Sequence, residues 1–326
     1  METLIMTHTD CDGICAGAIA LSMFRDAKIF FTKPVSLLSD LKNNPAGRTI
    51  ILDIAITRKD APEIIQNLAD RGEVLYFDHH PLPLNVKKQH IKISLFVHDT
   101  EASASELVYR HFQKTMPQER VWLAIYGAIG DYNVETKFMK DMVNDWDYRA
   151  LYFEASSLIL GIKNAEFDTY DAKRKIIQAL ALGSNPTDIG GLVESAARAV
   201  DEEFKIYENV KKNAESYGKI GFMRNLKYFG FRGPTALFAA TVTGKPVGMC
   251  IHKRRGLLDI TMRQRGHLYQ LNRLADAASL AVGGSGGGHP NAAGARIPGD
   301  SMEKFMGDLN RLMDSGKYNI QGVKND

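Results

Sequence analysis

Short apolar runs alternate with helical stretches along the first 80 residues, and this alternation constrains the fold more than any other feature. The runs lie at residues 4–6, 29–31, 49–52 and 74–77. Helix-forming segments occur between them at residues 16–25 and 62–71. Continuous apolar strands joined through helices are typical of a parallel sheet that is covered on both faces. We therefore predict an α/β fold that begins with a parallel sheet and has helices on both of its faces.

The rest of the chain divides into a helical region, a connector and a second α/β part. Residues 102–182 are mainly helical, a segment with glycine and proline follows, and residues 192–217 form one amphipathic pattern. Beyond it we expect strands at 236–242, 247–252, 257–262 and 294–297 and helices at 269–281 and 302–313. This organisation predicts an N-terminal domain (1–190), a helical connector (191–217) and a smaller C-terminal α/β domain (218–326).

Composition excludes several classes of protein. The 326 residues are enough for two domains, and 44% hydrophobic with 24% charged residues is typical of a soluble globular protein. No apolar run reaches the roughly 18 residues needed to cross a bilayer, and the N-terminus lacks the basic start of a signal peptide. Cys11, Cys15 and Cys250 cannot form a disulfide framework, so we expect a cytoplasmic protein with no membrane partner. A net charge of +3 is too small to require nucleic acid by itself.

Acidic and histidine side chains directly follow the apolar runs. The set comprises His8, Asp10, Asp12, Asp53, Asp78, His79, His80 and Asp131. Asp131 follows the apolar stretch 121–129, which we interpret as a further strand. Because the carboxyl ends of parallel strands line one edge of a sheet, we expect these side chains to converge there.

The residue types in this set favour two divalent cations. Carboxylates can bridge ions, imidazoles supply nitrogen ligands, and the absence of a thiolate cluster argues against structural zinc. The histidines favour Mn²⁺, with Mg²⁺ as the alternative. Two such ions roughly 3.5 to 4 Å apart activate water and clamp the oxygens of a phosphoryl displacement. Taken singly, Asp53 and Asp131 are more readily explained as cap or turn residues.

These elements resemble the motifs of the DHH phosphoesterase family, which is named after the tripeptide at positions 78–80. The resemblance covers essentially the whole chain and implies that residues 1–190 are a catalytic, metal-binding domain. It implies one ion held by His8 and Asp10 and a second held by Asp12, His79 and Asp131. Asp53 would bridge the two ions, Asp78 would orient a ligand or water, and His80 would face the substrate phosphate or leaving group.

A second informative stretch is the glycine-rich tract at residues 283–288, which ends in His289. Glycines let backbone amides approach an anion closely and form an anion-binding nest, to which His289 would add a donor. Arg263 follows a predicted strand that would aim it at the tract, where a guanidinium can bind phosphate through two hydrogen bonds. A flexible linker is the alternative for the glycines, and a solvated basic surface is the alternative for Arg263.

This stretch resembles the first subtype of DHH-associated C-terminal domain, found in the nano-RNase and pAp-phosphatase branch and in archaeal RecJ-like nucleases. The resemblance implies that the C-terminal domain binds substrate across an interdomain cleft, through Arg263, Gly286, Gly287, Gly288 and His289. We therefore expect a Mn²⁺-dependent phosphodiesterase or exonuclease that acts on single-stranded or short RNA or DNA. The alternatives are a pAp phosphatase, a linear or cyclic dinucleotide phosphodiesterase, and a replication-associated binding protein. A homodimer and replication or repair partners stay open.

Overall fold

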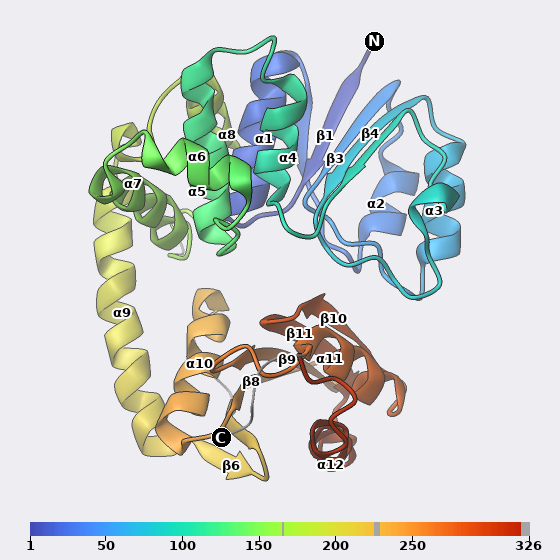
Figure 1. The fold of residues 1–326 in the computed structure, drawn as a ribbon, viewed down its shortest axis with the longest axis vertical. Helices are drawn as coiled ribbons and strands as arrows, with labels where there is room; N and C mark the ends of the chain where they lie inside the picture. Colours follow the sequence, from blue (N-terminus) through green and yellow to red (C-terminus); the bar gives the residue numbers. More distant parts are fainter. Residues whose placement is uncertain (165, 225–228, 321–326) are drawn as a thin grey trace. The chain divides into compact units, whose positions relative to one another are not determined.

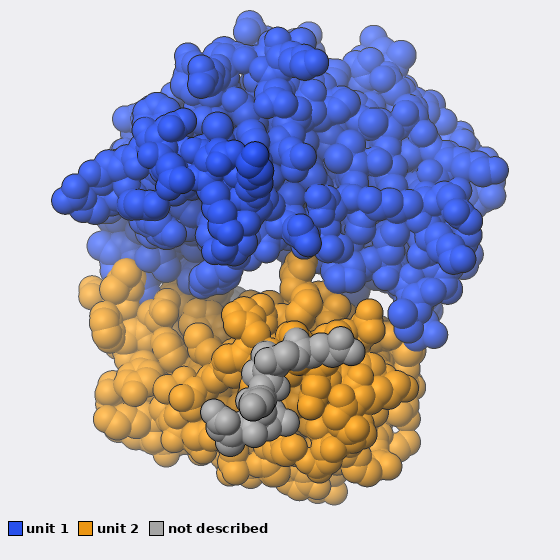
Figure 2. All heavy atoms as spheres, in the orientation of Figure 1, with its two compact units in different colours: residues 1–199 blue, residues 200–326 orange. Residues whose placement is uncertain are grey.

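The computed structural model describes residues 1–164, 166–224 and 229–320, which form two compact units (Figure 2). The first unit is Met1–Ala199 and the second is Val200–Asp326. Helix α9 (Leu192–Asn213) contains the boundary between them (Figure 1). Each unit has its own sheet and its own hydrophobic core, so the predicted α/β class with a second, smaller sheet domain is confirmed.

The first unit is built on a five-stranded sheet. Its strands are β1 (Thr3–Thr7), β2 (Lys28–Phe31), β3 (Arg48–Leu52), β4 (Glu73–Asp78) and β5 (Leu95–His98). They lie in the order β2-β1-β3-β4-β5, and every neighbouring pair is parallel. The predicted parallel sheet is therefore confirmed.

Helices cover both faces of this sheet, because successive strand residues point to opposite sides. Ile5 and Ile50 face one core, whereas Met6 and Ile51 face the other. The first core is covered by α1 (Cys11–Met23), α4 (Ala104–Phe112), α5 (Val121–Gly130), α6 (Lys137–Asn144), α7 (Tyr148–Gly161) and α8 (Tyr170–Leu182). The second is covered by α2 (Leu37–Asn43) and α3 (Ala61–Ala69), as Figure 1 shows. Within the described residues, no helix is long and apolar enough to span a membrane.

The strand order reverses between β1 and β3. From β1 the chain passes to β2 on one side, whereas β3 leads to β4 and β5 on the other. In open α/β sheets, ligands bind beyond the carboxyl ends of the strands at such a point. The segments that follow β1 and β3 therefore occupy the position where this fold accepts a ligand.

The second unit is a six-stranded mixed sheet in the order β10-β11-β9-β8-β7-β6. Its strands are β6 (Glu215–Tyr217), β7 (Ile220–Arg224), β8 (Val247–Arg254), β9 (Leu257–Gln264), β10 (Ser285–His289) and β11 (Ala292–Pro298). Helices α11 (Leu271–Leu280) and α12 (Met302–Asp314) pack their apolar residues into its core. The backbone of helix α10 (Arg232–Thr243) packs directly against the backbone of β8. A Cβ on Gly248 would lie 1.8 Å from the carbonyl oxygen of Ala236.

Three segments differ from the sequence-based expectation. Residues 236–242 lie inside α10, and residues 121–129 lie inside α5, although both were expected to be strands. The run at 121–129 is buried on nearly every side and so has no periodicity to separate helix from strand, whereas at 236–242 an apolar residue, Leu237, is exposed and hides the helical pattern. The helix predicted at 192–217 ends at Asn213, because Gly218, with a φ of 56°, allows the tight turn that pairs β6 with β7.

Candidate metal centre

The first site residues lie where β1 passes into α1. Asp10 caps the helix, since its Oδ1 accepts a hydrogen bond from the Gly13 amide at 3.1 Å. Its Oδ2 lies 2.6 Å from Nδ1 of His8. A Cβ at Gly13 would lie 2.6 Å from the carbonyl oxygen of His8, so only glycine lets the helix begin this close to the strand. The helix starts at Cys11, earlier than the predicted residue 16, and Asp12 therefore lies in its first turn.

Asp12 is buried and held by the start of helix α4. Its Oδ2 accepts a hydrogen bond from the Ala104 amide at 2.6 Å, and its Oδ1 accepts one from the Ser105 amide at 2.9 Å. These amides have no partner within their own helix, and the helix dipole favours a carboxylate there. Burial, together with the nearby Asp131 carboxylate, raises the pKa of Asp12 to about 6. Sequence reasoning missed this support, for which a serine-rich helix start at Ser103 and Ser105 was the available signal.

Asp53 directly follows β3, and both its backbone conformation and the environment of its side chain are unfavourable. Its φ is 57°, a left-handed conformation that few residues other than glycine, asparagine and aspartate adopt. Its side chain is buried, and among the described residues neither carboxylate oxygen accepts a hydrogen bond of suitable geometry. Burial and the charge of Asp10 raise the pKa of Asp53. A buried carboxylate left in this state is expected where a cation binds.

His79 points one ring nitrogen at several carboxylates. Its Nε2 lies 3.1 Å from Oδ2 of Asp131, 3.2 Å from Oδ1 of Asp53 and 3.8 Å from Oδ2 of Asp12. Burial lowers the pKa of His79, but the carboxylates of Asp131 and Asp53 outweigh it and raise the pKa to about 12. On the opposite side of the ring, the Asn133 amide lies 3.0 Å from Nδ1 and fixes the ring orientation.

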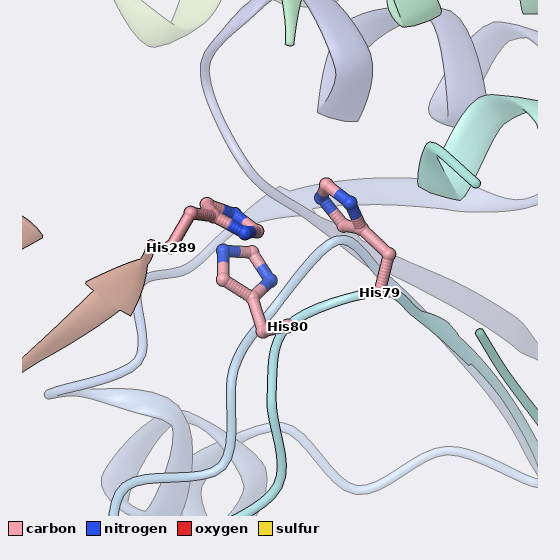
Figure 3. A group of neighbouring side chains, drawn as sticks. All are labelled: His79, His80 and His289. Carbon is pink, nitrogen blue, oxygen red and sulfur yellow. The ribbon is translucent and has the colours of Figure 1, made fainter. Parts of the chain in front are cut away.

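Asp78 and His80 form a pair beside this group. Asp78 is the last residue of β4 and is buried, and its Oδ1 lies 2.8 Å from Nδ1 of His80. Figure 3 shows His79 and His80 side by side in the segment that follows β4. The backbone of His80 is held as well, because its carbonyl oxygen lies 2.7 Å from Nε2 of His98, the residue opposite Asp78 on β5.

Three groups of possible ligand atoms share Asp53. One consists of His8, Asp10 and Asp53; another consists of Asp12, Asp53, His79 and Asp131; in each group the ligand atoms lie within 4.8 Å of one another. Asp53, Asp78 and His80 form a third such group. Carboxylates gathered this closely repel one another unless a cation separates them. The donor set and the buried oxygens of Asp53 therefore fit divalent metal ions.

The structure thus brings together all eight N-terminal residues singled out in the sequence. Asp131 reaches the group by a different route from the one expected, because it caps the C-terminal end of helix α5 and does not follow a strand. Asn133, Ala104 and Ser105 support the group and were not predicted.

In the second unit, residues Ser285–His289 of the glycine-rich tract form strand β10, paired antiparallel with β11, so this part of the tract is not a flexible linker. Gly286 is required for packing, since a Cβ there would lie 2.5 Å from the carbonyl oxygen of Ala275 in α11. Gly288 has a φ of 121°, whereas a Cβ at Gly287 would meet nothing within 4 Å. His289 ends the strand (Figure 3).

Arg263 lies in β9, one residue before this strand ends at Gln264. Arg263 is the cross-strand partner of Ala292, and its guanidinium lies against Gly233 at the start of α10. Gln264 is buried, and its side-chain amide donates to the carbonyl oxygen of Pro290 at 3.0 Å and to Oδ1 of Asn291 at 2.9 Å. These bonds hold the turn that follows His289.

Two family models match the sequence. The model of the DHH family N-terminal domain matches residues 2–130, and the model of the DHHA1 domain matches residues 234–315. In a comparison with curated proteins, none matches.

Several solved structures share the fold. A pGpG-specific phosphodiesterase, PggH from Vibrio cholerae, is 18% identical with a TM-score of 0.57, and the match covers 97% of this chain and 100% of that one. The DHH domain of a member of the s1p family of ribosomal proteins is 13% identical with a TM-score of 0.71, over 98% and 87%. RecJ from Thermus thermophilus, in complex with Mn²⁺, is 16% identical with a TM-score of 0.64, over 99% of this chain and 53% of RecJ. The chain thus carries a DHH family N-terminal domain followed by a DHHA1 domain, in this order, on the fold described above.

Proposed function

We propose that this chain is a Mn²⁺-dependent phosphodiesterase that hydrolyses single-stranded or short oligonucleotides with water activated between two divalent cations. Asp53 supports this proposal more than any other residue. Its buried carboxylate belongs to the group with His8 and to the group with His79, and the surrounding described residues leave its oxygens without a hydrogen bond of suitable geometry. A carboxylate in this position is suited to bridge two ions.

The remaining ligands divide between the two ions. His8 and Asp10 would complete one site, and Asp12, His79 and Asp131 would complete the other. Bound cations would lower the pKa of a water molecule and neutralise charge on the phosphate oxygens. The chain holds several of these ligands in place through other groups, such as the α4 amides on Asp12 and the Asn133 amide on His79. Little rearrangement would then be needed when metal and substrate bind.

Asp78 and His80 have a separate role in this proposal. Asp78 accepts a hydrogen bond from Nδ1 of His80 and so fixes the direction of the ring. Nε2 of the same ring would face the substrate phosphate or donate a proton to the leaving oxygen. In this proposal His80 contacts the substrate, whereas His79 binds a metal ion.

The second unit would bind the nucleotide part of the substrate through Arg263, Gly286, Gly287, Gly288 and His289. Gly287→Ala tests this assignment, because open space around position 287 lets the variant fold normally. The added methyl would take space that the substrate needs, so we expect KM to rise severalfold with little change in kcat. Gly307→Ala, on helix α12, is the matched control, since a Cβ there would meet only the Tyr217 hydroxyl at 4.0 Å.

For His289→Ala we likewise expect a raised KM and a milder effect on kcat, as measured by steady-state kinetics on a labelled oligonucleotide. A large fall in kcat at unchanged KM would instead mean that His289 takes part in the chemical step.

Hydrolysis of linear or cyclic dinucleotides is the second candidate function. It is supported by the similarity to the pGpG-specific phosphodiesterase of Vibrio cholerae, which extends over the whole of that protein. The two candidates share the metal centre and differ in the length of substrate.

One assay separates these functions. The protein is incubated with Mn²⁺ and oligonucleotides of graded length, labelled at the 5′ or the 3′ end, and in parallel with pAp and with cyclic dinucleotides. Products released from one labelled end would establish an exonuclease and its polarity, whereas activity confined to dinucleotides would favour the second candidate. Failure to hydrolyse any of them, with Mn²⁺ or Mg²⁺, would refute the proposed function.

A further inference from the structure

Helix α5 ends in a hydrogen-bonding pattern that ordinarily requires glycine. The Asn133 amide donates to the carbonyl oxygen of Ala128 at 2.8 Å, and the Tyr132 amide donates to that of Ile129 at 3.3 Å. This pair of bonds is the Schellman motif, in which the residue after the helix cap takes a left-handed conformation. Here that residue is Tyr132, with a φ of 58°.

A tyrosine in this position lowers stability, since a left-handed backbone is unfavourable for a residue with a bulky side chain. Its ring gains nothing from packing, because Tyr132 is 90% exposed, more than any other large hydrophobic residue of the described chain. The folded state therefore does not explain why a tyrosine is present.

The position of Tyr132 suggests what the ring is for. It lies between Asp131, a proposed metal ligand, and Asn133, which orients His79. Three non-glycine residues in the described part have a positive φ, and two of them, Asp53 and Tyr132, lie at this centre, while the third, Arg255, lies in the β8–β9 turn. Backbone strain of this kind concentrates at functional sites.

We propose that Tyr132 is a stacking platform for the nucleobase next to the phosphate that is cleaved. The inference rests on the proposed phosphodiesterase function. Tyr132 directly follows Asp131, so the two Cα atoms are about 3.8 Å apart and the exposed ring originates beside a proposed metal ligand. An exposed aromatic ring stacks on any base and so adds affinity without selecting a sequence.

Three variants of Tyr132 separate the effect of the aromatic ring from the effect of the strained backbone. Y132F keeps both, Y132A keeps the strain without the ring, and Y132G removes both. The assay compares kcat/KM for a short oligonucleotide with kcat/KM for the same molecule carrying an abasic tetrahydrofuran residue at the terminal position. We expect wild type and Y132F to prefer the base-bearing substrate about tenfold, and Y132A and Y132G to show a ratio near one. Only Y132G should melt at a higher temperature than wild type, by about 2 to 4 °C.

Binding provides a readout that does not depend on turnover. A dinucleotide containing 2-aminopurine, titrated with protein in EDTA, should lose fluorescence on stacking with wild type and Y132F but not with Y132A. An equal fall in kcat/KM on both substrates, or unchanged quenching in Y132A, would overturn the stacking role. If wild type instead hydrolyses neither substrate with Mn²⁺ or Mg²⁺, the proposed function itself fails, and quenching in EDTA still decides whether Tyr132 stacks on a base.

Discussion

Replacing Asp53 by asparagine is expected to abolish phosphodiester hydrolysis while raising the melting temperature of the metal-free protein. The Asp53 carboxylate is buried close to other acids, and the charge of Asp10 adds to the effect of burial in raising its pKa. Without a cation this charge is therefore unfavourable. Asparagine keeps the size of the side chain, tolerates the φ of 57° and carries no charge. Because it cannot bridge two cations in the same way, we expect activity to fall on the order of 10³-fold or more.

The measurement is thermal unfolding with and without Mn²⁺, next to the nuclease assay. At a Mn²⁺ concentration about 100 times its Kd, the wild-type protein should gain about 2.7 kcal/mol of stability, and Asp53→Asn should gain far less. Asp26→Asn makes the same chemical change at an exposed residue and is expected to change neither property. Retained activity of Asp53→Asn at saturating Mn²⁺ would refute the bridging role.

Gly127→Ala is expected to damage both the fold and the site. A Cβ at this position of helix α5 would lie 2.1 Å from Oγ of Ser105 and 2.5 Å from Oδ1 of Asp12. Neither neighbour can move freely, since Asp12 is bound by two α4 amides and Ser105 Oγ donates to the carbonyl oxygen of Ala124. We expect a loss of stability of about 1 to 3 kcal/mol, as is usual for overpacking, and a displaced Asp12.

Denaturant unfolding and the nuclease assay together test this prediction. The loss of activity should persist at temperatures where the variant is fully folded, because the displaced Asp12 no longer holds its ion. Gly190→Ala is the matched control in the same unit, since a Cβ there would meet nothing within 4 Å. A Gly127→Ala variant with wild-type stability and wild-type turnover would show that α5 can move away from Asp12 without consequence.

The sequence predicted those parts of the fold whose signal is local. The runs that became β1, β3 and β4 are bounded by turn or helix signals, and their continuous apolar character indicated a sheet buried on both faces. Helix α5 and helix α10 failed under the same reasoning. The apolar stretch of α5 is buried on nearly every side, and α10 carries an exposed apolar residue, Leu237, so in neither helix did local hydrophobic periodicity indicate which regular structure forms.

In the candidate site, the sequence predicted the possible metal ligands but not the groups that hold them in place. Residue types that bind cations, repeated after successive apolar runs, were enough to select all eight residues from His8 to Asp131. Their supports were not predicted, because the α4 amides meet Asp12 and Asn133 meets His79 only after distant segments pack together. The conformation of Tyr132 was also beyond sequence reasoning, since it follows from α5 being a helix that ends at this point.

By itself, the sequence determined that a parallel α/β sheet would gather carboxylates and imidazoles at the carboxyl ends of its strands. Strand topology makes that result general, because parallel strands place their ends at one edge whatever the packing around them. Only the tertiary structure decided how those ligands are shared and supported. Asp53 belongs to three ligand groups, and Asp12 is bound at the start of α4. Hydrogen bonds and close packing between segments far apart in the chain depend on distances of a few tenths of an ångström, which no local pattern of residues specifies.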